Sequence, residues 1–324
     1  MASNSVYSGV VTKMIVTKCP LRVSLAGGST DLQDFIDYHG SGSVISFPVN
    51  LYTYIILSSD VLGYNKIFGK YIINYTKREE ETKIENIKND IAREVLKHFN
   101  CKQVICTFYA DILSSGSGLA SSSSYTLALV KAVSKFKKIQ LSDFEVCKIS
   151  LEIEKRFNKH TGYQDIYGCG IGSLKRIDFK KGDDPKFTYI SQNIFNDINM
   201  YLIYTNVTRS STDLLANLDL KKRETLLKLV DSLETAIQQN NKTDFFNIIN
   251  EGWRKKKETS PLIINNSRVA EVDEYLIKDK NILAHKLCGA GSGGFFLAFT
   301  KDKVLNDKFI PATISEEGIR NISI

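Results

Sequence analysis

The stretch GSGLASSSSYTLALV at residues 116–130 constrains the fold most, because glycines and four consecutive serines directly precede a helical apolar pattern. Apolar residues from 128 to 136 follow the 3.6-residue period of a buried helix face. The preceding segment 104–109, VICTFY, is rich in β-branched and aromatic residues and predicts a strand. A small-residue loop between a strand and a helix lets backbone amides and the helix N-terminus contact an anion. The stretch predicts a phosphate-binding loop, with a flexible serine linker as the alternative.

The rest of the chain predicts an α+β architecture in two halves. The first half has expected strands at 14–25, 44–57, 67–75, 104–112 and 173–179, and expected helices at 85–99, 122–137 and 143–158. The second half has expected strands at 199–205 and on both sides of 288–294, and expected helices at 211–218, 222–239, 243–257 and 268–278. The polar loop KKGDDPK at 180–186 predicts a boundary, which divides the chain into domains 1–185 and 186–324.

Composition excludes several classes of protein. The chain has 324 residues, of which 43% are hydrophobic and 24% charged, as in soluble globular proteins. Apolar runs are too short for a membrane span, and the N-terminus lacks the cationic and apolar regions of a secretory signal. The 6 cysteines include no CxxC pair, which predicts reduced thiols in a cytoplasmic protein and no disulfide or zinc framework.

The net charge of +7 does not identify a nucleic-acid partner. Basic residues are dispersed, their densest cluster is 254–257, and no stripe of Lys and Arg alternates with aromatic residues. A moderate positive excess suits an enzyme that binds phosphorylated small molecules. A lysine-rich solvated surface is the alternative.

Two familiar nucleotide-binding patterns are absent or misplaced. A formal GxGxxG occurs in CGAGSGGF at 288–295, but the strand-like FFLAF follows it where a dinucleotide fold requires a helix. No GxxxxGK[ST] is present, and neither are the protein-kinase motifs HRDLxxxN and DFG. The chain therefore belongs to none of these three classes.

Four stretches occur together in the order and spacing of the GHMP small-molecule kinases: PLRVSLAGGSTD at 20–31, GSGLASSSS at 116–124, YQDIYG at 163–168 and KLCGAGSGGF at 286–295. The resemblance covers roughly residues 16–300. Through AGGSTDL, YQDIYG, YTNVTRSST at 204–212 and EGWRKKKETS at 251–260, the sequence is most similar to the bacterial D-glycero-D-manno-heptose 7-phosphate kinases. The resemblance implies an N-terminal domain like domain 2 of ribosomal protein S5, a ferredoxin-like C-terminal domain and a left-handed βαβ crossover.

The resemblance implies how ATP and Mg²⁺ bind. The middle loop is expected to wrap the triphosphate through Gly116, Ser117, Gly118, Leu119, Ala120, Ser121 and Ser122. Ser122 is expected to contact Mg²⁺ together with Glu154, which lies as far before Asp165 as the magnesium-binding glutamate does in mevalonate kinases. A merely solvated helix glutamate is the alternative. Ala120 stands where the family usually has glycine, and alanine does not readily adopt a positive φ.

The resemblance also assigns catalytic and acceptor-binding roles. Asp165 matches the catalytic aspartate, which orients the acceptor hydroxyl or takes its proton. Arg22 matches its cationic partner, and its alternation with Leu21 and Val23 places it away from the apolar side of a strand. The residues expected to bind the acceptor are Ser29, Thr30, Asp31, Thr208, Arg209, Gly289, Ala290, Gly291 and Ser292. Ser292 and Asn206 replace expected glycines.

The implied reaction is ATP-dependent phosphorylation of the anomeric C1 hydroxyl of D-glycero-D-manno-heptose 7-phosphate. The product, the 1,7-bisphosphate, would supply nucleotide-activated heptose for capsule or lipopolysaccharide synthesis. Arg209 is the first candidate to bind the 7-phosphate, ahead of Lys255–Lys257 and Lys175–Arg176. The alternatives are a kinase for fucose, galactose or an N-acylhexosamine, and a non-catalytic sugar- or RNA-binding protein. Small molecules are the expected partners, and the oligomeric state is left open, a homodimer included.

Overall fold

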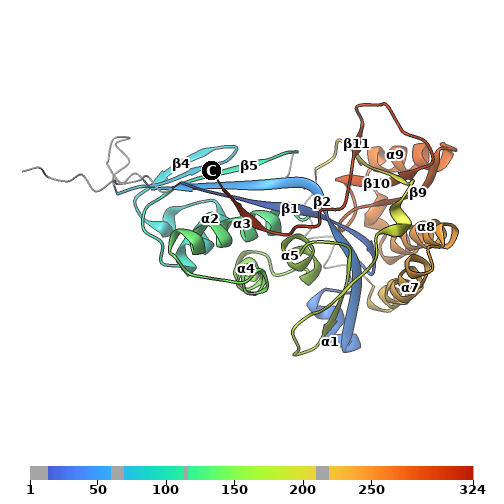
Figure 1. The fold of residues 1–324 in the computed structure, drawn as a ribbon, viewed down its shortest axis with the longest axis horizontal. Helices are drawn as coiled ribbons and strands as arrows, with labels where there is room; N and C mark the ends of the chain where they lie inside the picture. The colour runs from blue at the N-terminus through green and yellow to red at the C-terminus, as the bar shows by residue number, and fades with distance from the viewer. Residues whose placement is uncertain (1–13, 60–68, 113–115, 209–218, 324) are drawn as a thin grey trace, which may run out of the picture.

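A computed structural model describes residues 14–59, 69–112, 116–208 and 219–323. Two long antiparallel strands, β1 (Ile15–Ala26) and β2 (Ser41–Ser58), extend from the N-terminal part toward the C-terminal helices (Figure 1). They belong to an eight-stranded sheet of order β12-β1-β2-β5-β3-β4, in which β6 also pairs with β2 and β7 with β6. Its other strands are β3 (Tyr71–Asn74), β4 (Arg78–Glu81), β5 (Ile105–Ala110), β6 (Lys175–Lys180), β7 (Lys186–Tyr189) and β12 (Arg320–Ile322).

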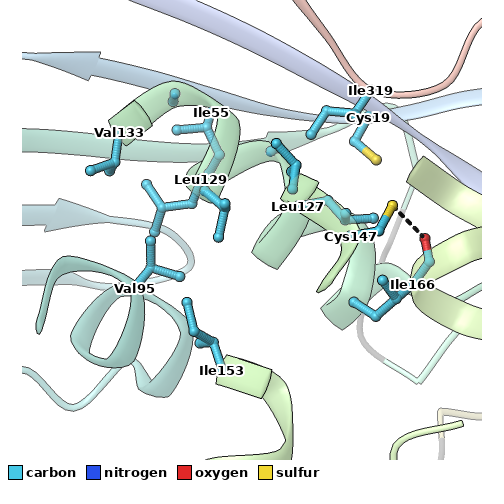
Figure 2. Packing of buried hydrophobic residues seen from close by; sticks show 14 of the residues in the cluster. Cys19, Ile55, Val95, Leu127, Leu129, Val133, Cys147, Ile153, Ile166 and Ile319 are labelled. Carbon is cyan, nitrogen blue, oxygen red and sulfur yellow. Dashed lines mark hydrogen bonds between the residues drawn. The ribbon is translucent and has the colours of Figure 1, made fainter. Parts of the chain in front are cut away.

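Four helices cover one side of this sheet (Figure 1): α2 (Asp90–His98), α3 (Ser121–Phe136), α4 (Asp143–Phe157) and α5 (Tyr163–Gly170). Helix α3 lies at the centre of the apolar core, where Leu129 packs among Ile55, Val95 and Ile153 (Figure 2). These side chains are fully buried, and each large one contributes roughly 1.5–3 kcal/mol relative to an exposed position. The core therefore fixes α3, and with it the position of the loop that precedes α3.

The C-terminal part contains a second, antiparallel sheet of order β11-β8-β10-β9. Its strands are β8 (Asn199–Tyr204), β9 (Ile282–Leu287), β10 (Phe295–Thr300) and β11 (Phe309–Pro311). The helices of this part are α7 (Leu220–Gln238), α8 (Lys242–Thr259) and α9 (Ser267–Lys278). Trp253 of α8 packs on Phe296 of β10 and belongs to the core of this part. The described residues include no helix long and apolar enough to cross a membrane.

A second apolar core is built from both parts of the chain. Val23 of β1 and Phe47 of β2 share it with Val230 of α7, Phe245 of α8 and Leu297 of β10. The strand β12 also returns to pair with β1 at the edge of the first sheet. The domain boundary between residues 185 and 186 stays a prediction. The two parts of the chain are packed together through a continuous apolar core.

The structure departs from the expected elements in several places. Residues 163–170 form helix α5 and residues 33–39 form helix α1 (Gln33–His39), neither of which was predicted. The strands β4 and β7 were also not expected. The expected helix at 85–99 begins only at Asp90, because the side chain of Asn89 caps it there. The expected helix at 211–218 lies outside the described residues. All 6 cysteines are buried and free in the structure.

Candidate active site

A cavity of about 650 Å³ lies where the two parts of the chain meet. It is lined by the end of β1, the loop before α3, the N-terminus of α5 and the loop after β9. It brings together most of the predicted site residues: Arg22, Ser29, Asp31, Gly116, Ser117, Gly118, Ala120, Ser121, Ser122, Glu154, Asp165, Gly289 and Ala290. Thr30, Leu119, Thr208, Gly291 and Ser292 do not line it, and Arg209 lies outside the described residues.

An ion pair between Arg22 and Asp165 lies on the wall of this cavity. The Nε and Nη2 atoms of Arg22 donate to Asp165 Oδ1 at 3.0 and 2.6 Å, and Nη1 donates to the carbonyl oxygen of Gly118 at 2.8 Å. Helix α5 can approach Arg22 closely because Gly168 has no side chain. A Cβ at that position would lie 3.2 Å from the side chain of Arg22. Both bonds from Arg22 end on Oδ1, so Oδ2 of Asp165 is available to an acceptor hydroxyl. Arg22 is buried under α5, which the strand alternation alone did not predict.

Asp31 caps the helix that carries Asp165. Its Oδ2 accepts from the backbone N–H of Gln164, the second residue of α5, at 3.0 Å. Its Oδ1 accepts from Gln164 Nε2 at 3.0 Å and from the N–H of Ser29 at 3.1 Å. A Cβ on Gly162 would lie 2.3 Å from Asp31 Oδ2, so glycine leaves room for this carboxylate. Burial, reinforced by the charge of Asp165, raises the pKa of Asp31 to about 6.

Arg223 is a structural residue of the site that the sequence reasoning missed. It lies on α7 with 1% exposure and binds both carboxylate oxygens of Asp34, at 3.0 and 2.7 Å. It also donates to the carbonyl oxygen of Ser29 at 3.3 Å, where the backbone has a φ of 77°. The two-pronged guanidinium thereby attaches the 27–31 loop to the C-terminal part. No sequence signal distinguishes this arginine from a solvated helix residue.

Glu154 lies beneath the N-terminus of α3. The residue is 2% exposed, and its carboxylate accepts from Ser123 Oγ at 2.7 Å. Burial raises its pKa to about 7, although hydrogen bonds from Ser123 and Ser122 oppose that shift. Ser122 itself is exposed to the cavity. A carboxylate and neighbouring hydroxyls form the oxygen set that Mg²⁺ prefers, so these residues fit such an ion.

Three residues that replace expected glycines adopt left-handed backbone angles. Ala120, the residue before α3, has a φ of 63°, Asn206 has 59° and Ser292 has 61°. These are the three positions at which the resemblance expects glycine. A left-handed conformation costs roughly 1–2 kcal/mol for a residue with a Cβ. The loops therefore keep a glycine-like backbone path despite the substitutions.

The glycine-rich loop after β9 contacts the loop before α3 directly. The N–H of Phe295 donates to the carbonyl oxygen of Ser117 at 3.1 Å. Gly294 has a φ of 92°, and a Cβ there would lie 2.3 Å from that same oxygen. Its own carbonyl accepts from the N–H and hydroxyl of Thr205 at 3.0 and 2.8 Å. Only glycine fits at this junction between the two parts of the chain.

Both parts match models of one protein family. Residues 86–173 match the GHMP kinases N terminal domain, and residues 233–312 match the GHMP kinases C terminal domain. The chain belongs to the GHMP kinases, and the predicted α+β fold class is confirmed. It is accordingly a kinase that transfers a phosphoryl group to an alcohol.

Individual relatives refine this likeness. The chain is 27% identical to a D-glycero-alpha-D-manno-heptose 7-phosphate kinase of Campylobacter jejuni, covering 94% of this chain and 95% of that relative. It is 24% identical to an L-fucokinase/L-fucose-1-P guanylyltransferase of Bacteroides fragilis, of which it spans only 38%. A crystal structure of a D-glycero-D-manno-heptose 1-phosphate kinase from Bacteroides thetaiotaomicron superposes with a TM-score of 0.74 at 20% identity, covering 96% of this chain and 99% of that one. A Lactococcus lactis galactokinase complexed with galactose superposes with a TM-score of 0.75 at 16% identity, covering 96% and 95%. These two likenesses concern the fold.

Proposed function

We propose that this chain is a cytoplasmic, ATP-dependent kinase that phosphorylates the anomeric C1 hydroxyl of D-glycero-D-manno-heptose 7-phosphate. The product is the 1,7-bisphosphate, which would serve the synthesis of nucleotide-activated heptose for capsule or lipopolysaccharide. The observation that carries the proposal is the Arg22–Asp165 pair, which lies in one cavity with the small-residue loop before α3. The full-length likeness to a heptose 7-phosphate kinase supports the choice of acceptor.

In the proposed mechanism Asp165 acts on the acceptor. Its Oδ2 accepts the hydrogen bond of the C1 hydroxyl and either aligns this hydroxyl or takes its proton. Arg22 holds the carboxylate in place through two hydrogen bonds to Oδ1. The backbone amides of 116–120 and the N-terminus of α3 bind the phosphates of ATP. Arg22 also ties the catalytic pair to this loop through Gly118.

Glu154 and Ser122 would hold Mg²⁺ in this site. When bound, the ion neutralises charge on the phosphate oxygens. Glu154 offers a carboxylate that already accepts from Ser123, and Ser122 offers a hydroxyl that faces the cavity. The two side chains lie at the N-terminal end of α3, which the phosphates are proposed to contact. Their oxygen atoms and their position therefore both suit a Mg²⁺ ion beside the phosphates.

Glu154→Gln is expected to raise the Mg²⁺ concentration needed for half-maximal activity by about ten- to a hundredfold, the scale of losing one charged ligand. Ser122→Ala is expected to raise it less. The measurement is the initial rate of ADP formation, titrated with MgCl₂ at fixed ATP. Glu145→Gln is the matched control, because Glu145 is exposed in the first turn of α4, the helix that also carries Glu154, and a glutamine preserves its capping box. A Glu154→Gln enzyme with the wild-type titration would place the carboxylate ligand elsewhere.

The proposed acceptor is tested with a panel of sugars. We expect the wild-type enzyme to use heptose 7-phosphate with a far higher kcat/KM than heptose, fucose, galactose or an N-acylhexosamine. ADP release gives the rates, and ³¹P NMR of the product locates the new phosphate on C1. A preference for fucose would favour the alternative suggested by the likeness to the fucokinase. Transfer to a hydroxyl other than C1 would contradict the proposed reaction.

A further inference from the structure

The N-terminus of α5 depends on Asp31, which belongs to the loop after β1. Gly162, the residue before the helix, has no side chain that could cap it. The first backbone N–H of the helix, that of Tyr163, donates to the carbonyl oxygen of Asp31 at 3.3 Å, and the second, that of Gln164, donates to its carboxylate at 3.0 Å. The third, that of Asp165, donates to the carbonyl oxygen of Gly162 at 3.3 Å. Asp31 therefore satisfies the first two N–H groups of the turn that carries Asp165.

The carboxylate of Asp31 is already occupied by donors of the protein. The residue lies on the cavity wall, but its exposed fraction is 0%. Besides the backbone N–H of Gln164 on Oδ2, its Oδ1 accepts from the side-chain amide of Gln164 and from the N–H of Ser29. A sugar hydroxyl would have to displace one of these three hydrogen bonds to reach the carboxylate. The geometry thus favours a role toward α5 over the acceptor contact that the resemblance implies.

The loop that carries Asp31 is itself fixed to the first sheet. The hydroxyl of the preceding Thr30 accepts from the N–H of Ser43 in β2 at 3.2 Å, and both of these residues are buried. From β1, the strand before this loop, Arg22 binds Oδ1 of Asp165. The side chain of Asp165 and the helix turn that carries it are therefore held by two neighbouring parts of the same β1–β2 connection.

We propose that Asp31 is a positioning residue, which holds the first turn of α5 so that Asp165 presents Oδ2 to the acceptor hydroxyl. The inference rests on the proposed function, because it takes Asp165 to act on that hydroxyl. Arg22 fixes only Oδ1, so the direction of Oδ2 depends on where the helix turn lies. A displacement of about 1 Å at a reacting group costs roughly a hundredfold in rate. Loss of the cap is therefore expected to lower turnover and to leave acceptor binding nearly unchanged.

Gly162 offers a way to disturb this cap without removing a charge. Its φ of −80° and ψ of 146° are open to alanine, but a Cβ there would lie 2.3 Å from Asp31 Oδ2. Gly162→Ala must therefore push the carboxylate of Asp31 and the end of α5 apart. Gly252→Ala in α8 is its matched control, because a Cβ at Gly252 would make only an ordinary contact, at 3.6 Å from Leu229.

The test measures kcat and KM in single and double variants. Asp31→Ala and Gly162→Ala are each expected to lower kcat by about ten- to a hundredfold, with KM values for the acceptor and for ATP near those of the wild type. Asp31→Asn keeps an oxygen for the N–H of Gln164 and should retain more turnover than Asp31→Ala. The double variant Asp31→Ala with Gly162→Ala is expected to have the kcat of Asp31→Ala alone, because no carboxylate is left for the new methyl group to displace.

The assay conditions and a second control separate positioning from charge and from folding. Assays at pH 8 keep Asp31 ionised in the wild type, since burial raises its pKa to about 6. Asp37→Ala is the matched control for Asp31→Ala, because Asp37 is an exposed carboxylate of α1 that pairs with Lys181 at 3.1 Å. Its kinetic constants should equal those of the wild type. If Asp31→Ala fails to fold, the comparison of Gly162→Ala with Gly252→Ala still decides the proposal.

Three results would overturn the positioning role. A raised KM for the acceptor with an unchanged kcat would assign Asp31 to acceptor binding. An unchanged kcat in both single variants would show that the cap does not affect Asp165, and fully additive losses in the double variant would show that Gly162 does not act through Asp31. The kinetics use whichever sugar the wild type prefers, so they do not depend on the choice of acceptor. A wild type inactive toward every sugar of the panel would refute the proposed function itself, and this result needs no variant.

Discussion

Asp165→Asn lowers kcat by at least about 10²-fold, the usual scale for loss of a positioned acid or base, and leaves ATP binding nearly unchanged. The amide keeps the size of the carboxylate but neither accepts a proton nor balances the charge of Arg22. Asp165 lies in the first turn of α5 and Arg22 bonds only its Oδ1, so the substitution acts on the group that faces the acceptor. Initial rates at saturating substrates give kcat, and a fluorescent ATP analogue gives nucleotide affinity.

Asp178→Asn is the matched control for this result. Asp178 also pairs with an arginine, Arg176, at 2.8 Å, but it lies on β6 outside the cavity. Its substitution removes an Arg–Asp pair of similar length without touching the acceptor. We expect kcat to stay within the wild-type range. Near-normal turnover by Asp165→Asn would show that Asp165 is not catalytic, and an equal loss in both variants would point to a general structural effect.

Gly294→Ala destabilises the protein by about 2–5 kcal/mol and raises the KM for ATP. An alanine at a φ of 92° costs roughly 1–2 kcal/mol, and crowding in a packed site adds roughly 1–3 kcal/mol. The new Cβ would lie 2.3 Å from the carbonyl oxygen of Ser117, which is backbone and cannot rotate away. The contact between the two glycine-rich loops must therefore open, and the proposed phosphate loop moves with it. Urea unfolding and ATP-dependent initial rates measure the two effects.

Gly182→Ala separates the free-energy cost of placing alanine at a positive φ from the cost of the steric clash at Gly294. Gly182 has a φ of 82°, close to that of Gly294, but a Cβ there would meet nothing within 4 Å. We expect a loss of about 1 kcal/mol and an unchanged KM for ATP. If both alanine variants lose the same stability and bind ATP equally, the contact between Gly294 and Ser117 has no functional role.

Local patterns were enough to predict the parts of the site that depend on neighbouring residues. The serine run and the apolar period predicted helix α3, which begins at Ser121. The expected helix at 143–158 forms as α4, and both hydrogen bonds of the capping box between Ser142 and Glu145 are present at its start. The positive φ of Ala120 is different, because alanine disfavours it locally and the packing that fixes α3 imposes the path of the loop.

Contacts between distant residues could not be predicted in this way. Helix α5 has no side-chain cap of its own at Gly162, and its cap is Asp31, which is 133 residues from Gln164. Helix propensity and capping signals depend only on neighbouring residues, so this helix was not predicted. Arg223 and Lys286 find their partners 189 and 261 residues away, at Asp34 and Leu25. These side chains make their contacts only when the N-terminal and C-terminal parts of the chain pack against each other.

The core shared by β1, β2, α7, α8 and β10 affects how the protein must be made. While the ribosome has released only the first half of the chain, Val23 and Phe47 have no apolar partners from the second half. The edge of β1 that receives β12 also stays unpaired until residue 322 has been synthesised. Exposed apolar side chains and an open strand edge favour aggregation, so nascent chains of this protein depend on rapid completion or on chaperones.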